Sequence, residues 1–142
     1  MKIKPFTLAE VEYTSHRLAK ELMYWDEPIP EFKTRFSGIL ESCLEVPFGK
    51  FGGRQFYKGL TGKAAALFYL MIKNHPFQNG NKRIAVTTLL LFLDKNGKWL
   101  RIDTQELYNF AKWVAASNPR LKEATIAATE QFLKMYMVDR IG

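Results

Sequence analysis

The sequence predicts an all-α fold of about six helices around a central buried helix, and three observations predict it. Apolar residues recur at helical spacing between stretches rich in Gly, Pro and Asn. Residues 81–96 carry the run IAVTTLLLFL, which is apolar almost all round, as in a helix that others enclose. No segment shows convincing strand alternation, with the exception of a short stretch from Lys98 to Ile102.

The N-terminal part is predicted to hold two helices joined by a connection. Thr7 and Glu10 have the spacing of a capping box, and apolar residues follow at helical spacing to about Met23. The second helix is expected from about Pro30, a favoured first-turn residue, to about Leu44. The proline-containing stretch between them is predicted as the connection.

Glycines and aromatic residues interrupt the helical pattern at residues 47–57, which predicts a short flap or hairpin. An Ala-rich apolar helix is expected over 61–74. The central helix follows over 81–96, with Gly97 as its C-cap.

The C-terminal part is predicted to hold two more helices. Asp103 and Glu106 repeat the capping-box spacing at the start of the first. Asn118 and Pro119 are predicted to open the last helix, which runs to about Met137.

The composition indicates a single globular domain over residues 1–142, because 47% of the residues are apolar and 25% are charged. The single cysteine, Cys43, cannot form an intramolecular disulfide, and we expect it to be buried. The start of the sequence lacks the apolar region of a signal peptide, and no apolar stretch is long enough to span a bilayer. We therefore expect a cytoplasmic protein without a membrane partner. The net charge of +7 favours anionic partners.

The segment NHPFQNGNKR, residues 74–83, is the candidate functional site. Pro76 disfavours helical geometry at His75, so the helix before it should end there. Asn79 and Gly80 suit a tight turn, after which the central helix begins near Asn81. The free N–H groups of such a helix start can bind phosphate.

Two cations in the first turn of the central helix strengthen this interpretation. Lys82 and Arg83 oppose the positive end of the helix dipole, and a bound polyphosphate would explain them. His75 can accept a proton near neutral pH, which fits attack of a hydroxyl on a phosphoryl group. Read singly, each feature could also be a surface histidine, a turn or a solvated basic pair.

The whole string resembles the signature of the Fic/Doc family, HxFx(D/E)(G/A)N(G/K)R. Its flanks resemble the Doc, or death-on-curing, branch: LESCLEVPFGKFGGRQFY and KAAALFYLMIKNHPF precede it, and LLLFLDKNG follows it. The resemblance covers roughly residues 5 to 120 and implies the Fic/Doc fold.

The resemblance also implies roles for individual residues. His75 would be the general base for a target hydroxyl, and Phe77 would be a buried aromatic that anchors the loop. Gly80 and Asn81 would form the anion-binding turn, with the Asn81 side chain helping to hold phosphate. Arg83 would neutralise the phosphates. The segment from 47 to 57 would take the place of the flap that aligns a target segment by strand addition.

Lys82 favours one reaction of the family over another. Most adenylyl-transferring relatives have Gly at this position, whereas Doc-type proteins have Lys. The Doc toxin of the family transfers the terminal phosphate of ATP to elongation factor Tu. The resemblance therefore implies a toxin that binds ATP and phosphorylates a protein such as elongation factor Tu, with AMP transfer as the alternative.

Asn79 departs from the family pattern, which has Asp or Glu there to help hold Mg²⁺. An amide oxygen can still bind Mg²⁺, but it supplies no charge. The metal could be held more weakly, another group could help, or the chain could be a catalytically inert module that binds a nucleotide or a partner.

The remaining predictions concern regulation and other partners. Residues 37–42 come close to the self-inhibitory pattern (S/T)xxxE(G/N) but end in Ser42, so we interpret them as an ordinary helix. Restraint would then come from a cognate antitoxin. We expect His16 to be solvated rather than catalytic. A nucleic-acid-binding protein would explain the charge but would give His75 no role, so nucleic acid is not an expected partner.

Overall fold

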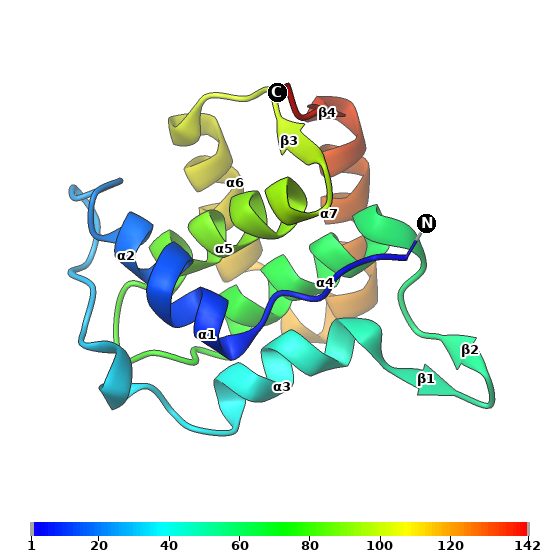
Figure 1. The fold of residues 1–142 in the computed structure, drawn as a ribbon, viewed down its shortest axis with the longest axis horizontal. Coiled ribbons are helices and arrows are strands. Elements are labelled where there is room, and N and C mark those ends of the chain that lie inside the picture. Colours follow the sequence, from blue (N-terminus) through cyan, green and yellow to red (C-terminus); the bar gives the residue numbers. More distant parts are fainter. Residues whose placement is uncertain (1, 142) are drawn as a thin grey trace.

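The computed structural model describes residues 2–141 and confirms the all-α prediction. The helix that opens the chain is continuous from Leu8 to Ala19, and five further helices follow it, with two small antiparallel strand pairs (Figure 1). The helices are α1 (Leu8–Glu10), α2 (His16–Ala19), α3 (Ile39–Glu45), α4 (Gly59–Lys73), α5 (Asn81–Lys95), α6 (Thr104–Ala116) and α7 (Lys122–Tyr136). The strands are β1 (Lys50–Phe51), β2 (Arg54–Gln55), β3 (Lys98–Leu100) and β4 (Met137–Asp139).

The first helix starts as predicted and ends early. The capping box is present, because Glu10 N–H donates to Thr7 Oγ1 at 3.1 Å and Thr7 N–H donates to Glu10 Oε1 at 2.9 Å. A π-helical segment, Val11–Ser15, joins α1 to α2. The predicted end at Met23 is wrong: the helix stops at Ala19, and the carbonyl groups there accept bonds from Arg83 instead.

The predicted helix from Pro30 to Leu44 is wrong over its first half. A short 3-10 turn, Phe32–Thr34, is followed by extended backbone, and α3 begins only at Ile39. Phe36 N–H donates to the carbonyl of Pro76 at 2.9 Å, so this segment packs on a distant loop. Gly38 then takes a positive φ of 86°, which helical geometry does not allow.

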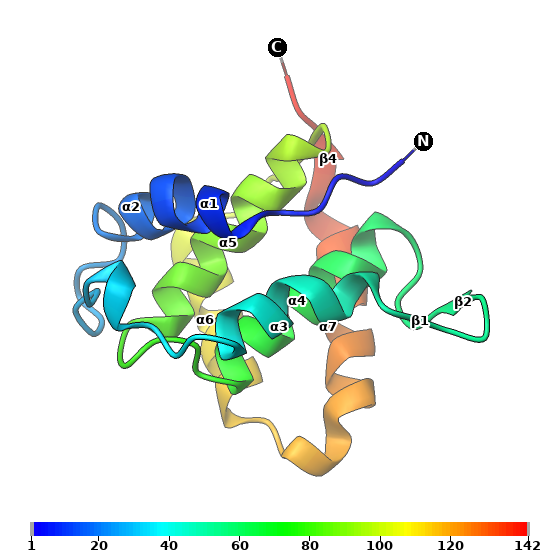
Figure 2. The same cartoon turned by 60° about the horizontal axis from the view of Figure 1, so that its bottom comes forward.

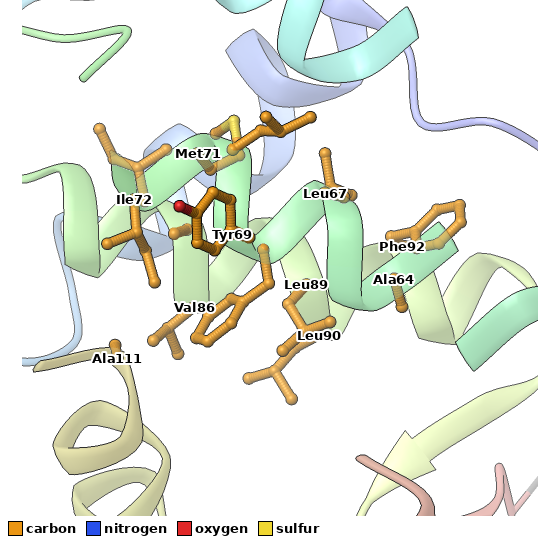
Figure 3. Packing of buried hydrophobic residues seen from close by; sticks show 14 of the residues in the cluster. Ala64, Leu67, Tyr69, Met71, Ile72, Val86, Leu89, Leu90, Phe92 and Ala111 are labelled. Carbon is orange, nitrogen blue, oxygen red and sulfur yellow. The ribbon is translucent and has the colours of Figure 1, made fainter. Parts of the chain in front are cut away.

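The central helix is confirmed. It was predicted over 81–96, and α5 runs from Asn81 to Lys95, with α2, α4, α6 and β3 packed around it (Figures 1 and 2). Apolar side chains of α4 and α5 interdigitate, with Ala111 of α6 nearby (Figure 3). The predicted C-cap also holds, since Gly97 has a φ of +79°.

The hairpin predicted at residues 47–57 is present as β1 paired with β2. It projects from the end of the molecule where α4 begins, far from the loop between α4 and α5 (Figure 2). Lys63, on the first turns of α4, donates to Gln55 and to the carbonyl of Tyr57, which fastens the base of the hairpin to the helix.

The C-terminal helices differ from the prediction in their first turns. Asp103 precedes α6, but its side chain makes no capping hydrogen bond, so the predicted capping box is absent there. Pro119 opens a 3-10 turn, and α7 begins at Lys122. The short strand predicted after Gly97 is present as β3, which pairs with β4.

Within residues 2–141, no helix combines the length and the apolar character that crossing a membrane requires.

Candidate functional site

His75 lies directly after the end of α4, as predicted. Asn74 caps the helix, and His75 then takes a left-handed conformation with a φ of +51°. This conformation costs a residue with a Cβ about 1 kcal/mol, so the surrounding loop must hold it. The side chain is exposed to solvent, where a protein hydroxyl could reach it.

Two residues after His75 anchor the loop to the core. Pro76 is buried, and its carbonyl accepts the bond from Phe36 N–H. The Phe77 side chain is 1% exposed and lies with its ring centroid 5.8 Å from His16 and 6.0 Å from Phe32. The loop that carries His75 is therefore fixed from below by an aromatic cluster.

His16 belongs to this cluster, so the prediction of a solvated His16 is wrong. The residue is 3% exposed, and its Nε2–H donates to the carbonyl of Pro30 at 2.8 Å. Burial lowers the pKa of His16. The His16 side chain therefore packs against Phe32 and Phe77 on the inner face of its helix.

Asn81 braces the loop from the other side. Its Oδ1 accepts from Phe77 N–H at 2.9 Å, and its Nδ2 donates to the carbonyl of Phe77 at 2.9 Å. Both polar ends of the amide are thus occupied by the backbone of one residue. In this structure the Asn81 side chain shapes the turn instead of facing out of it.

Gly80 forms the turn at the start of α5. Its φ is +71°, and its carbonyl accepts the first helical bond, from Ile84 N–H at 3.0 Å. A Cβ at this position would lie 2.6 Å from Ile29 Cδ1 and 3.1 Å from the carbonyl oxygen of Pro28. Only glycine fits the turn, because the backbone of another segment presses against it.

Arg83 is buried, with 3% exposure, and serves a segment far away in the sequence. Its guanidinium donates to the carbonyls of Ala19 at 2.6 Å and Glu27 at 2.7 Å, and twice to that of Leu22, at 2.8 and 3.1 Å. Burial lowers the pKa of Arg83, and the carboxylate of Asp26 opposes this. The predicted role of Arg83, to neutralise phosphate, would add to its role in binding these backbone carbonyls.

Lys82 is half-buried and Asn79 is exposed beside the turn. Across residues 2–141, no three His, Cys, Asp or Glu side chains come together as a metal site. Asn79 offers a side-chain oxygen at the surface, and Mg²⁺ keeps most of its waters and takes few protein ligands.

The β1–β2 hairpin lies at the opposite end of α4 from His75. A helix of 15 residues spans about 20 Å, so a segment added to the hairpin would lie far from the histidine. The predicted docking role of residues 47–57 therefore does not fit this arrangement. The loop that carries His75 borders a cavity of about 320 Å³, which is lined by Gly38, Ile39, Ser42 and Asn74.

Glu41, the glutamate of the near-match to the self-inhibitory pattern, has a local role. Its carboxylate accepts from Gly38 N–H at 3.1 Å and lies 3.9 Å from Arg35 Nη2. It thus caps α3, as expected for an ordinary helix.

Residues 26–29 contribute to the site, although their sequence predicts only a connection. Glu27 accepts from Gly80 N–H through Oε1 at 3.3 Å. No local pattern marks Glu27, because 53 residues separate it from its partner. The prolines around it indicate only a rigid segment.

Comparison with known proteins agrees with this geometry. A segment of 73 residues, 51% of the chain, is 37% identical to a protein of Mycolicibacterium smegmatis named Toxin Doc, and it covers 56% of that protein. The chain thus spans little more than half the length of this relative. No solved structure matches the chain. A model of the Fic/DOC family matches residues 5–93, which include the loop, the turn and most of α5, and the chain therefore belongs to the Fic/DOC family.

Proposed function

We propose that the chain is a Doc-like toxin that transfers the terminal phosphate of ATP to a hydroxyl of a target protein. The observation that carries this proposal is the pairing of an exposed His75 with the Gly80 turn across one short, braced loop. His75, the proposed proton acceptor, and the start of α5, the proposed phosphate site, flank that loop.

The reaction would proceed by direct displacement. The target oxygen attacks the γ-phosphorus while His75 takes the hydroxyl proton, and the bond from the γ-phosphorus to the bridging β–γ oxygen breaks. ADP leaves with the electron pair of that bond. The amides at the start of α5 would hold phosphate oxygens, and Lys82 would add positive charge beside them.

Lys82 supports phosphate transfer over the alternative, AMP transfer, because Doc-type proteins share this lysine. The relative's name, Toxin Doc, supports the same branch. We propose elongation factor Tu as the first target to test, and a cognate antitoxin as the partner that restrains the toxin.

Mg²⁺ bound with the nucleotide would neutralise charge on its phosphates. Asn79 would offer the metal a side-chain oxygen that carries no charge. Weaker metal binding is therefore part of the proposal.

A second function, a catalytically inert binding module, is favoured by one specific observation. The four hydrogen bonds of Arg83 all go to backbone carbonyls, and this leaves its guanidinium committed to the fold. A chain in which Arg83 is structural and Asn79 is neutral could hold a nucleotide without turnover.

The test uses ATP labelled at the α- or the γ-phosphate, Mg²⁺, the purified chain, and elongation factor Tu or a bacterial lysate as acceptor. The proposal expects γ-label alone on the acceptor. His75→Asn is the control, because Asn tolerates the left-handed backbone of this position and removes the base. It should abolish transfer and leave the fold intact.

The other outcomes separate the alternatives. Transfer of α-label would show AMP transfer and overturn the inference from Lys82. If neither label is transferred to the acceptor by the natural chain or by Asn79→Asp, the chain is no transferase for these acceptors. The result would then favour the catalytically inert binding module.

A further inference from the structure

The Gly80 turn, which the proposed function assigns to phosphate, already binds a carboxylate of the chain itself. The Glu27 carboxylate accepts the Gly80 amide N–H at 3.3 Å, at the positive end of α5. This donor is one of those that the proposed function assigns to a nucleotide phosphate.

The segment that carries Glu27 is fastened to the turn at two further points. Arg83 donates to the main-chain carbonyl of Glu27 at 2.7 Å, so the guanidinium fixes the backbone from which the carboxylate extends. Pro28 and Ile29 cover the side of Gly80 on which a Cβ would stand. Three independent contacts therefore seat residues 27–29 on the turn.

The electrostatics favour competition between this carboxylate and a phosphate. Both are anions that seek the same amide and the same helix end, and like charges placed there would repel. Glu27 is exposed, and among residues 2–141 its carboxylate makes no hydrogen bond or ion pair besides the bond to Gly80, so it can leave the turn by rotating into solvent.

We infer that Glu27 sets the nucleotide affinity of this site by occupying the phosphate-binding amide of Gly80 until ATP displaces it. This inference rests on the proposed function, since it takes the Gly80 turn as the nucleotide site. It differs from inhibition by an added helix, because Glu27 acts from the connection between α2 and the 3-10 turn at Phe32.

An alternative for Glu27 is that its carboxylate replaces the charge missing at Asn79 and binds the metal. The two possibilities predict opposite results. A competing carboxylate weakens ATP binding, so its removal strengthens binding. A metal ligand supports ATP binding, so its removal weakens it.

The test measures ATP binding in the presence of Mg²⁺ by calorimetry on the full chain and on variants. Glu27→Ala should lower the Kd about tenfold, because the site no longer has to release a charge-assisted hydrogen bond. Glu27→Gln keeps an acceptor and loses the charge, so it should lower the Kd by a smaller factor, about threefold.

Glu31→Gln is the matched control. It removes the same charge from the same connection, but Glu31 pairs with Lys33 at 3.3 Å on the exposed surface. Its Kd should stay within about twofold of the natural chain, since surface pairs of this kind contribute little.

The amide signal of Gly80 in the nitrogen–proton NMR spectrum supplies a second readout. Without ATP, it should shift in Glu27→Ala and stay in place in Glu31→Gln. With ATP, it should shift in the natural chain as the nucleotide takes the amide.

The outcomes separate a failure of the role of Glu27 from a failure of the proposed nucleotide site. An unchanged or raised Kd in Glu27→Ala overturns the role of Glu27 and leaves the nucleotide site in place. If ATP binds neither the natural chain nor the folded Glu27→Ala variant, the proposed nucleotide site fails and the inference fails with it.

Discussion

At the scale of single residues, Arg83 shows how a motif residue can be essential to the fold. Its guanidinium satisfies the carbonyls of Ala19, Leu22 and Glu27, which lie where the first helix ends and the connection begins. These carbonyls have no helical partner, and burial would make them costly if left unpaired.

Replacement of Arg83 should therefore destabilise the protein before any question of catalysis arises. Arg83→Met is expected to lower the free energy of unfolding by about 2–4 kcal/mol, measured by urea denaturation. The control is Arg140→Met, because Arg140 is half-exposed and its pair with Asp94 is at the surface, so its cost should be about 0.5 kcal/mol or less. Equal effects of the two substitutions would contradict this role of Arg83.

Gly80 carries a second residue-scale prediction, about the close contact with residues 28 and 29. Gly80→Ala should cost about 2–3 kcal/mol, because the new Cβ adds a clash with Pro28 and Ile29 to the strain of a left-handed alanine. Gly53→Ala is matched to it: Gly53 has a φ of +79° and open space around it, so only about 1 kcal/mol is expected. Urea denaturation of both variants tests this, and similar losses would mean that residues 28 and 29 yield freely.

At the scale of elements, two helix starts with the same sequence spacing differ in the structure. Thr7 and Glu10 form a complete capping box, whereas the Asp103 side chain makes no capping bond. Thr7→Ala should therefore cost about 1 kcal/mol of stability and Asp103→Ala only a few tenths. Thermal unfolding of the two variants measures the difference, and a larger loss for Asp103→Ala would show that it caps α6 in solution.

Elements differ in how well the sequence predicts them, and the reason is the range of the contacts that decide them. The helices at 61–74 and 81–96 were predicted to within two residues, because long apolar runs leave few alternatives. The region from Pro30 to Gly38 was predicted wrongly, because a hydrogen bond from Phe36 N–H to the carbonyl of Pro76 decides its course. The spacing of neighbouring apolar residues cannot predict a hydrogen bond to a partner 40 residues away.

The same distinction applies to the candidate site. The turn at Gly80 and the end of α4 before His75 follow from local residues, and both were predicted. The partners of Arg83 and the contact of Glu27 with Gly80 join segments more than 50 residues apart. His16 was misjudged for a related reason, since the aromatic side chains packed against it, Phe32 and Phe77, come from two other segments of the chain.

At the scale of the whole molecule, the buried His16 makes stability depend on pH. Burial lowers its pKa, and the proximity of Lys20 acts in the same direction. The unfolded chain therefore binds a proton at a pH where the folded chain does not, so acid favours unfolding. The stability that neutral His16 contributes is present above about pH 6.5 and is lost as the pH falls from there toward the lowered pKa.

The melting temperature should accordingly fall between about pH 7.5 and pH 5.5, a window above the ordinary titration of carboxylates. His16→Gln, which can still donate to the carbonyl of Pro30, should flatten this dependence. His75→Asn should preserve it, because His75 is exposed and the chain has only two histidines. The pH dependence of the melting temperature could instead persist in His16→Gln and vanish in His75→Asn. The proton taken up on unfolding would then belong to His75, and burial in the aromatic cluster would not keep His16 neutral.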